Sequence, residues 1–173
     1  MRLVALLVAF VIAAGPAIAD PHAGLPSSPR DVYNAMLEYT RDGNFDKLAK
    51  SMKYTGGLMR ELGHECGADF EQELRDAIAK RDAALARATL HKLIATDIRR
   101  LVARAGASSG WSKRETVQVA FAVFGLVDGA VASVGEVRAA FKQLYKATDA
   151  DATRERARFI IERVTDAFPR CAR

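Results

Sequence analysis

A chain of 173 residues can form one domain with a sizeable core, and half of its residues are hydrophobic. Its 26 basic and 21 acidic side chains give a mild positive excess that is spread along the sequence, so we interpret most of it as solvated helix faces. No stretch of any length shows strand periodicity, which excludes the fold classes built on sheets and predicts an all-α protein.

The first segment of the chain has the pattern of a cleaved signal peptide, which we assign to residues 1–19. Arg2 precedes a long apolar run, Gly15 and Pro16 interrupt it, and Ala17 and Ala19 fit the small-x-small rule for cleavage. An uncleaved membrane anchor is the alternative, but the interrupted helix and the cleavage pattern favour removal. We therefore expect an exported, periplasmic protein.

The predicted cleavage site also sets the boundaries of the segments that follow. The mature chain is expected to begin at Asp20, with a flexible lead over residues 20–28 and a single helical domain over 29–173. The apolar stretch 117–134 contains Gln118 and Asp128, so no membrane span is expected in the mature chain. Because an exported protein rarely meets nucleic acid, we expect no nucleic-acid partner.

Residues 69–105 are predicted to form one long central helix. The stretch has no Pro or Gly and is rich in Ala, Leu, Arg, Glu and Lys, which are good helix formers. Asp69 can cap its start together with Gln72, and Gly106 fits its end. A helix of this length would be about 50 Å long. It needs other helices along its side, which predicts a bundle of about five to six helices.

The other helices follow from apolar spacing and capping residues. The first runs from Pro29 to about Asp42, and the second from the cap Asn44 to Gly63. Three more are expected, beginning after the cap residues Ser112, Ser133 and Thr148, and the last of them ends at Pro169.

Two cysteines, Cys66 and Cys171, are the smallest number that can form a disulfide, and export makes one permissible. We predict that they are bridged. A reactive or metal-binding thiol is the alternative for either residue.

His64 and Glu65 precede Cys66 in the turn after the second helix, so the three could ligate a metal or perform acid–base chemistry. The trio lacks the helical i, i+4 spacing of H-E-x-x-H and any C-x-x-C partner. We interpret His64 and Glu65 primarily as exposed turn residues and keep them as candidate ligands.

His91 and Asp128 are the second pair of candidate metal or small-ligand residues, because both lie on apolar helix faces. Asp128 follows Phe124 by four residues, so an unbroken helix would direct its carboxylate into the core. A buried carboxylate needs a cation or strong donors. Three interpretations stay open: a structural pair of Asp128 with an Arg or with His91, a ligand pocket shared by His91 and Asp128, or a solvated turn at Asp128.

No nucleophile elbow, phosphate loop, haem attachment site or zinc spacing is present, so no catalytic group can be assigned. The leading hypothesis is a non-catalytic periplasmic module that binds a protein partner or stabilises an assembly. The alternative is a bundle that binds a metal or small ligand near His91 and Asp128, of unknown cofactor. An enzyme that uses His64, Glu65 or His91 ranks last. An anionic surface is a further candidate partner, through the basic residues Arg99, Arg100, Arg104, Arg154 and Arg158.

Overall fold

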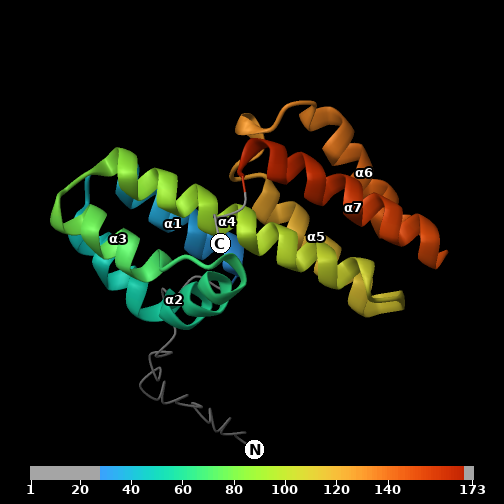
Figure 1. Cartoon of the computed structure of the whole chain (residues 1–173), viewed down its shortest axis with the longest axis horizontal. Coiled ribbons are helices and arrows are strands. Elements are labelled where there is room, and N and C mark those ends of the chain that lie inside the picture. The colour runs from blue at the N-terminus through green and yellow to red at the C-terminus, as the bar shows by residue number, and fades with distance from the viewer. Residues whose placement is uncertain (1–27, 170–173) are drawn as a thin grey trace, which may run out of the picture.

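The computed structural model describes residues 28–169, and within this range the chain is helical throughout, without strands (Figure 1). This confirms the all-α prediction. The helices are α1 (Pro29–Arg41), α2 (Phe45–Cys66), α3 (Phe70–Ala79), α4 (Ala83–Gly106), α5 (Gly110–Phe124), the short 3₁₀ helix η1 (Asp128–Ala130), α6 (Val134–Lys146) and α7 (Ala150–Ala167).

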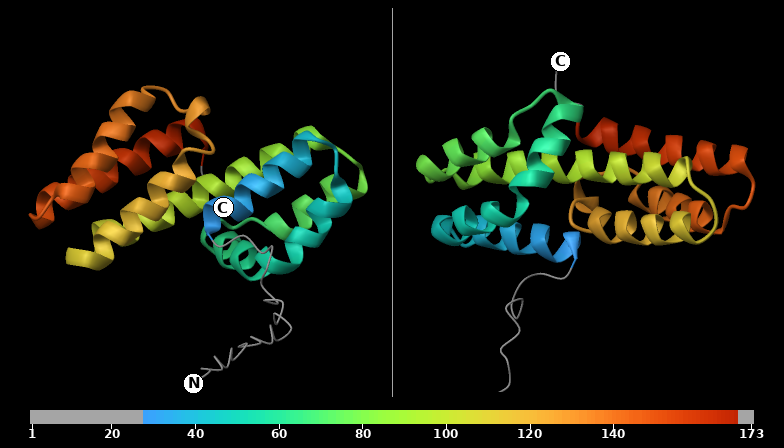
Figure 2. Two further views of the ribbon diagram at one scale, coloured as in Figure 1. Left: turned by 180° about the vertical axis from the view of Figure 1, so that it is seen from behind. Right: turned by 90° about the horizontal axis from the view of Figure 1, so that it is seen from below.

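Helix α4 is shared by two groups of helices. Helices α1, α2 and α3 pack around its first part, and α5 and α7 pack along its later part, with α6 against α5 and α7 (Figures 1 and 2). Its buried face therefore changes neighbours along its length, and Leu90, Ile94, Ile98 and Val102 are all fully buried. Helix α4 has 24 residues and a length of about 36 Å, shorter than the single helix expected over residues 69–105.

The prediction of one continuous helix over residues 69–105 is wrong. The chain leaves α3 after Ala79 and starts α4 at Ala83, with Arg81 in the left-handed region at φ 51°. The carboxylate of Asp82 accepts a hydrogen bond of 2.9 Å from the backbone N–H of Leu85, so Asp82 caps α4. The left-handed residue Arg81 and the aspartate cap of α4, rather than Pro or Gly, interrupt the helix here. The chain therefore reverses, and α3 packs against α4.

Helix α2 continues one turn beyond its predicted end at Gly63. It ends at Cys66 with Gly67 in the left-handed conformation at φ 68°, and the backbone N–H groups of Gly67 and Ala68 both bond the carbonyl of Gly63. A Cβ at Gly63 would lie 2.5 Å from the carbonyl oxygen of Ala68, so a glycine is required inside the helix. His64 and Glu65 thus belong to a helix rather than to a turn.

The other predicted helix boundaries agree with the structure only in part. Helix α1 agrees with the prediction to one residue, and Asn44 caps α2 by accepting from Lys47 N–H. Ser112 is not a cap, since α5 already begins at Gly110, and α7 is capped by Asp149 instead of Thr148. Ser133 does precede α6, but without a side-chain capping bond.

The core is one apolar cluster to which every α-helix contributes. Among the described residues, no helix combines the length and apolar character that crossing a bilayer requires. Two side chains that carry a charge at neutral pH are buried in this part of the chain, Asp97 at 1% exposure and Lys113 at 4%. Burial of a charge is costly unless it is paired, so these two residues identify the polar features of the fold.

Candidate functional site

His91 lies half-buried on α4, where its ring makes an edge-on contact with Phe168 at 6.0 Å between centroids. Burial lowers the pKa of the imidazole, and the nearby charge of Arg87 lowers it further. The structure therefore favours the neutral histidine, packed against the residue that follows α7.

Asp128 lies in η1, because α5 ends at Phe124 and the chain turns before the predicted core position is reached. Its carboxylate forms an ion pair with Arg138 of α6, and its side chain is 18% exposed. This geometry combines two of the three interpretations, a turn and a pair with an arginine. The contacts of His91 and Asp128 are separate, so the geometry gives no support to a shared pocket.

His64 and Glu65 are exposed on the last turn of α2. Among the residues that the structure describes, no three His, Cys, Asp or Glu side chains are grouped closely enough to hold a metal ion. The structure therefore adds no partner for a metal at either position.

Cys66 is buried at the end of α2, and Cys171 lies outside the described residues, so the disulfide stays a prediction. A chain of contacts nevertheless leads from Cys66 toward the C-terminus. The Thr96 hydroxyl lies 3.8 Å from Cys66 Sγ and accepts a 2.9 Å hydrogen bond from Arg99, whose other terminal nitrogen donates to the carbonyl of Phe168 at 2.9 Å. Because of these contacts, the described end of the chain lies close to Cys66. Cys171 follows Phe168 by three residues in the sequence.

The sequence interpretation missed a polar network between α1, α2 and α4 that is buried at Tyr33 and Asp97. The Tyr33 hydroxyl donates to Asp97 Oδ2 at 2.9 Å, and Arg100 donates to Asp97 Oδ1 at 2.8 Å and to Glu61 at 2.9 Å. Burial, and then the charge of Asp97, raise the pKa of Tyr33 well above its usual range, so the phenol stays a donor. Both oxygens of the carboxylate are partnered, which indicates a structural role.

A signal for this network was present in the spacing. Asp97 follows Leu93 by four residues and Ile94 by three, so it lies on the apolar arc of α4. The structure also corrects the interpretation of Arg99 and Arg100 as a solvated basic face. Both are half-buried and bonded within the fold, which removes them from any anion-binding surface.

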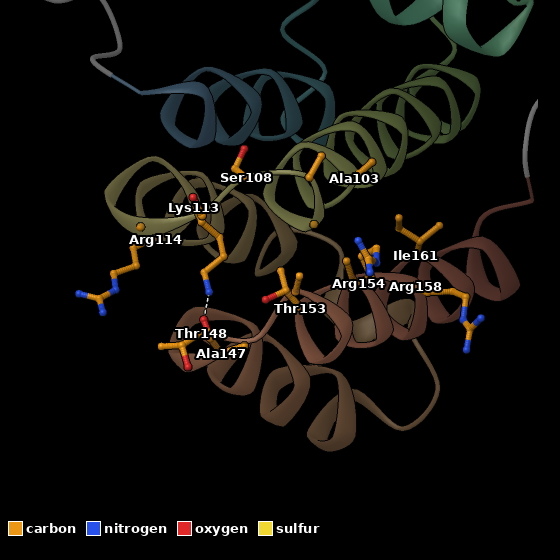
Figure 3. Close-up of a pocket in the computed structure, with 16 residues that line it drawn as sticks. Ala103, Ser108, Lys113, Arg114, Ala147, Thr148, Thr153, Arg154, Arg158 and Ile161 are labelled. Atoms are coloured by element: carbon orange, nitrogen blue, oxygen red, sulfur yellow. Dashed lines mark hydrogen bonds between the residues drawn. The ribbon is translucent and has the colours of Figure 1, made fainter.

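A cleft of about 910 Å³ lies between the α4–α5 turn, α5, the α6–α7 connection and α7 (Figure 3). Small and hydroxyl-bearing side chains make up most of its lining. Its four charged lining residues are all basic: Lys113, Arg114, Arg154 and Arg158. No Asp or Glu of the described residues lines it, so the charges on the lining itself are positive.

Lys113 supplies the buried charge at one end of this basic cleft. Its ammonium donates to the backbone carbonyl of Ala147, at the C-terminal end of α6, as the dashed line in Figure 3 marks. This position is favourable for a cation because carbonyls at a helix C-terminus carry partial negative charge. Burial, and then the neighbouring charge of Arg114, lower the pKa of Lys113. An ammonium has three donors, and the described residues provide it with a single acceptor.

Arg154 and Arg158 lie one turn apart on α7, at the opposite wall of the cleft. Arg154 pairs with Asp151, and Arg158 lies 3.8 Å from Glu162, but all four side chains are at least 62% exposed. Exposed pairs of this kind contribute little to stability and are readily exchanged for another anion. The two arginines are therefore available to a ligand.

Sequence spacing could not reveal this cleft, because its walls come from segments that lie far apart in the chain. The sequence grouped Arg154 and Arg158 with Arg99 and Arg100 as one candidate anion-binding surface. The fold separates these two pairs and places Lys113 and Arg114 of α5 opposite the arginines of α7. The arrangement can bind anions.

Comparison of the chain with protein-family models, with curated proteins and with solved structures finds no match.

Proposed function

We propose that this protein is an exported, non-catalytic helical module that binds an acidic protein partner in the basic cleft. The observation that carries the proposal is the cleft itself, with its four basic lining residues and no carboxylate among the described ones. Electrostatic complementarity of this kind speeds association and selects partners by charge. The volume of about 910 Å³ exceeds what a single inorganic anion needs.

Export supports a partner outside the cytoplasm. The signal-peptide pattern over residues 1–19 falls outside the described residues, and so does the expected mature N-terminus at Asp20. Intact mass of protein recovered from the periplasm should correspond to a chain that starts at Asp20. Recovery of the full-length chain from the membrane fraction would contradict this part of the proposal.

The alternative function, a metal or small-ligand site near His91 and Asp128, is not favoured by any observation, since the two residues have separate partners. The basic cleft is equally unsuited to a metal cation, because its charged lining residues are positive.

Photo-crosslinking in the native compartment tests the proposal. A benzophenone amino acid at Ala107, an exposed cleft residue, should crosslink a partner, whereas the same group at Tyr54, 71% exposed on α2, should not. The crosslink should disappear in Arg154→Glu/Arg158→Glu. It should persist in Lys50→Glu/Lys80→Glu, which changes the net charge equally at exposed positions outside the cleft. Equal crosslinking in both double variants would overturn the proposal.

A further inference from the structure

The cleft is long enough to receive a short helical segment. Its α7 wall extends from Ala150 to Ile161, or about 16 Å along the helix axis. Its opposite wall is formed by Ala103, Gly106 and Ala107 near the end of α4. Small side chains on both walls allow the backbone of an inserted segment to approach closely.

The two walls are themselves closely packed where they meet. A Cβ placed on Gly106 would lie 2.9 Å from Cβ of Ala157, so α4 and α7 are in tight contact there. That contact forms the apolar floor of the cleft. The basic lining residues are Arg154 and Arg158 on α7 and Lys113 and Arg114 on α5. An occupant must therefore present an apolar face to the floor and anionic groups to the rim.

The spacing of the rim charges selects a helical occupant. Arg154 and Arg158 are four residues apart, so their side chains leave α7 about 6 Å apart along its axis. Carboxylates at positions i and i+4 of a partner helix have the same separation. Lys113, held by Ala147 at one end of the groove, provides a third cation beyond this pair.

Other anionic occupants fit less well. A phosphate site needs donors that converge on one point, whereas these cations are distributed along a groove. A bilayer surface is flat on this scale and cannot enter a concave cleft.

We infer that the basic cleft receives an acidic helix of the partner protein, with Asp or Glu side chains one helical turn apart facing Arg154 and Arg158 and a small apolar face against α4 and α7. This inference rests on the proposed function, which names the site and the acidic protein, and it adds the secondary structure and the charge register of the bound segment.

Synthetic peptides and the full mature protein provide the test. The probe is an alanine-rich, fluorescently labelled peptide of about 16 residues with glutamates at i and i+4. The matched control has the same composition and helicity with the glutamates at i and i+2, which face different directions. We expect the first peptide to bind about tenfold more tightly by fluorescence anisotropy, and to lose that advantage with Arg154→Glu/Arg158→Glu.

A charge exchange makes the test specific. A peptide with lysines at i and i+4 should bind the Arg154→Glu/Arg158→Glu protein better than it binds the unaltered protein. The helical inference would be overturned by equal affinity for the two glutamate registers, or by an unfolded crosslinked segment in the native partner. Either result would leave the acidic-partner proposal standing. Binding to phosphatidylglycerol vesicles with no binding of either peptide would overturn both.

Discussion

The hydroxyl of Tyr33 donates a 2.9 Å hydrogen bond to Oδ2 of Asp97, and both residues are at most 1% exposed. This bond joins α1 to α4 through polar atoms inside an otherwise apolar core. Because Arg100 occupies the other oxygen of the same carboxylate, the position of Asp97 is fixed from two sides.

Removal of the Tyr33 hydroxyl should destabilise the fold. Tyr33→Phe leaves a buried carboxylate with one donor fewer, and hydrogen bonds to charged groups contribute about 1.5–3 kcal/mol. We expect a loss in that range by urea denaturation. The control Tyr54→Phe removes a hydroxyl from a residue that is 71% exposed and should change stability by less than about 0.5 kcal/mol. Equal effects in the two variants would contradict the structural role of the bond.

His91 should make stability fall in mild acid. Because burial lowers the pKa of its imidazole below the ordinary value of about 6.5, folding favours the neutral form. The stabilising contribution is therefore present above about pH 6.5 and is lost as the pH falls through the lowered value. NMR titration should show a depressed pKa for His91. His91→Gln should reduce the pH dependence of the unfolding free energy. His64→Gln, at an exposed position, should leave the contribution of His91 to that pH dependence unchanged.

Two glycines of α2 should respond in opposite directions to alanine. Gly63→Ala places a Cβ 2.5 Å from the backbone oxygen of Ala68, and overpacking of this kind costs about 1–3 kcal/mol. A methyl group added at Gly57 would meet no neighbour within 4 Å, so Gly57→Ala should stabilise the helix by up to about 1 kcal/mol. Thermal unfolding of both variants checks this, and a stabilising Gly63→Ala would show that the turn after α2 can relax freely.

Two aspartates should differ sharply when each is changed to alanine. Asp128 pairs with Arg138, whose side chain is 54% exposed, and a pair of this kind contributes at most about 1 kcal/mol. Asp97→Ala removes a buried partner of Arg100 and Tyr33, and should cost about 3–5 kcal/mol. Denaturation midpoints compare the two directly. A loss of several kcal/mol in Asp128→Ala would restore the case for a structurally or functionally essential carboxylate at that position.

Natively exported protein should contain a Cys66–Cys171 disulfide. In the chain-entropy description, closing a loop of about 100 residues stabilises the fold by roughly 4–5 kcal/mol. Non-reducing peptide mapping should recover the cross-linked pair, and a reductant should lower the stability of the unaltered protein but not that of Cys171→Ser. Two free thiols in the exported protein would refute the bridge and would return Cys66 to the candidate metal ligands.

Local sequence patterns were sufficient to predict the helical class, the extent of α1 and the cap at Asn44. These features depend on spacing and capping chemistry, which neighbouring residues encode directly. The same patterns did not reveal the break at Arg81–Asp82. A helix former can adopt the left-handed conformation when a following aspartate caps the next helix and tertiary packing stabilises the turn.

The roles of the polar residues depend on tertiary packing. Periodicity places Asp97 on an apolar face and Arg154 on a basic one, but it does not say which faces meet. The fold turns Arg100 inward to Asp97 and brings Lys113 of α5 opposite the arginines of α7. A structural pair and a binding cleft have the same residue types in sequence. They differ in burial: Asp97 is enclosed by Tyr33 and Arg100, whereas Arg154 and Arg158 are exposed. Contacts between distant segments determine that burial.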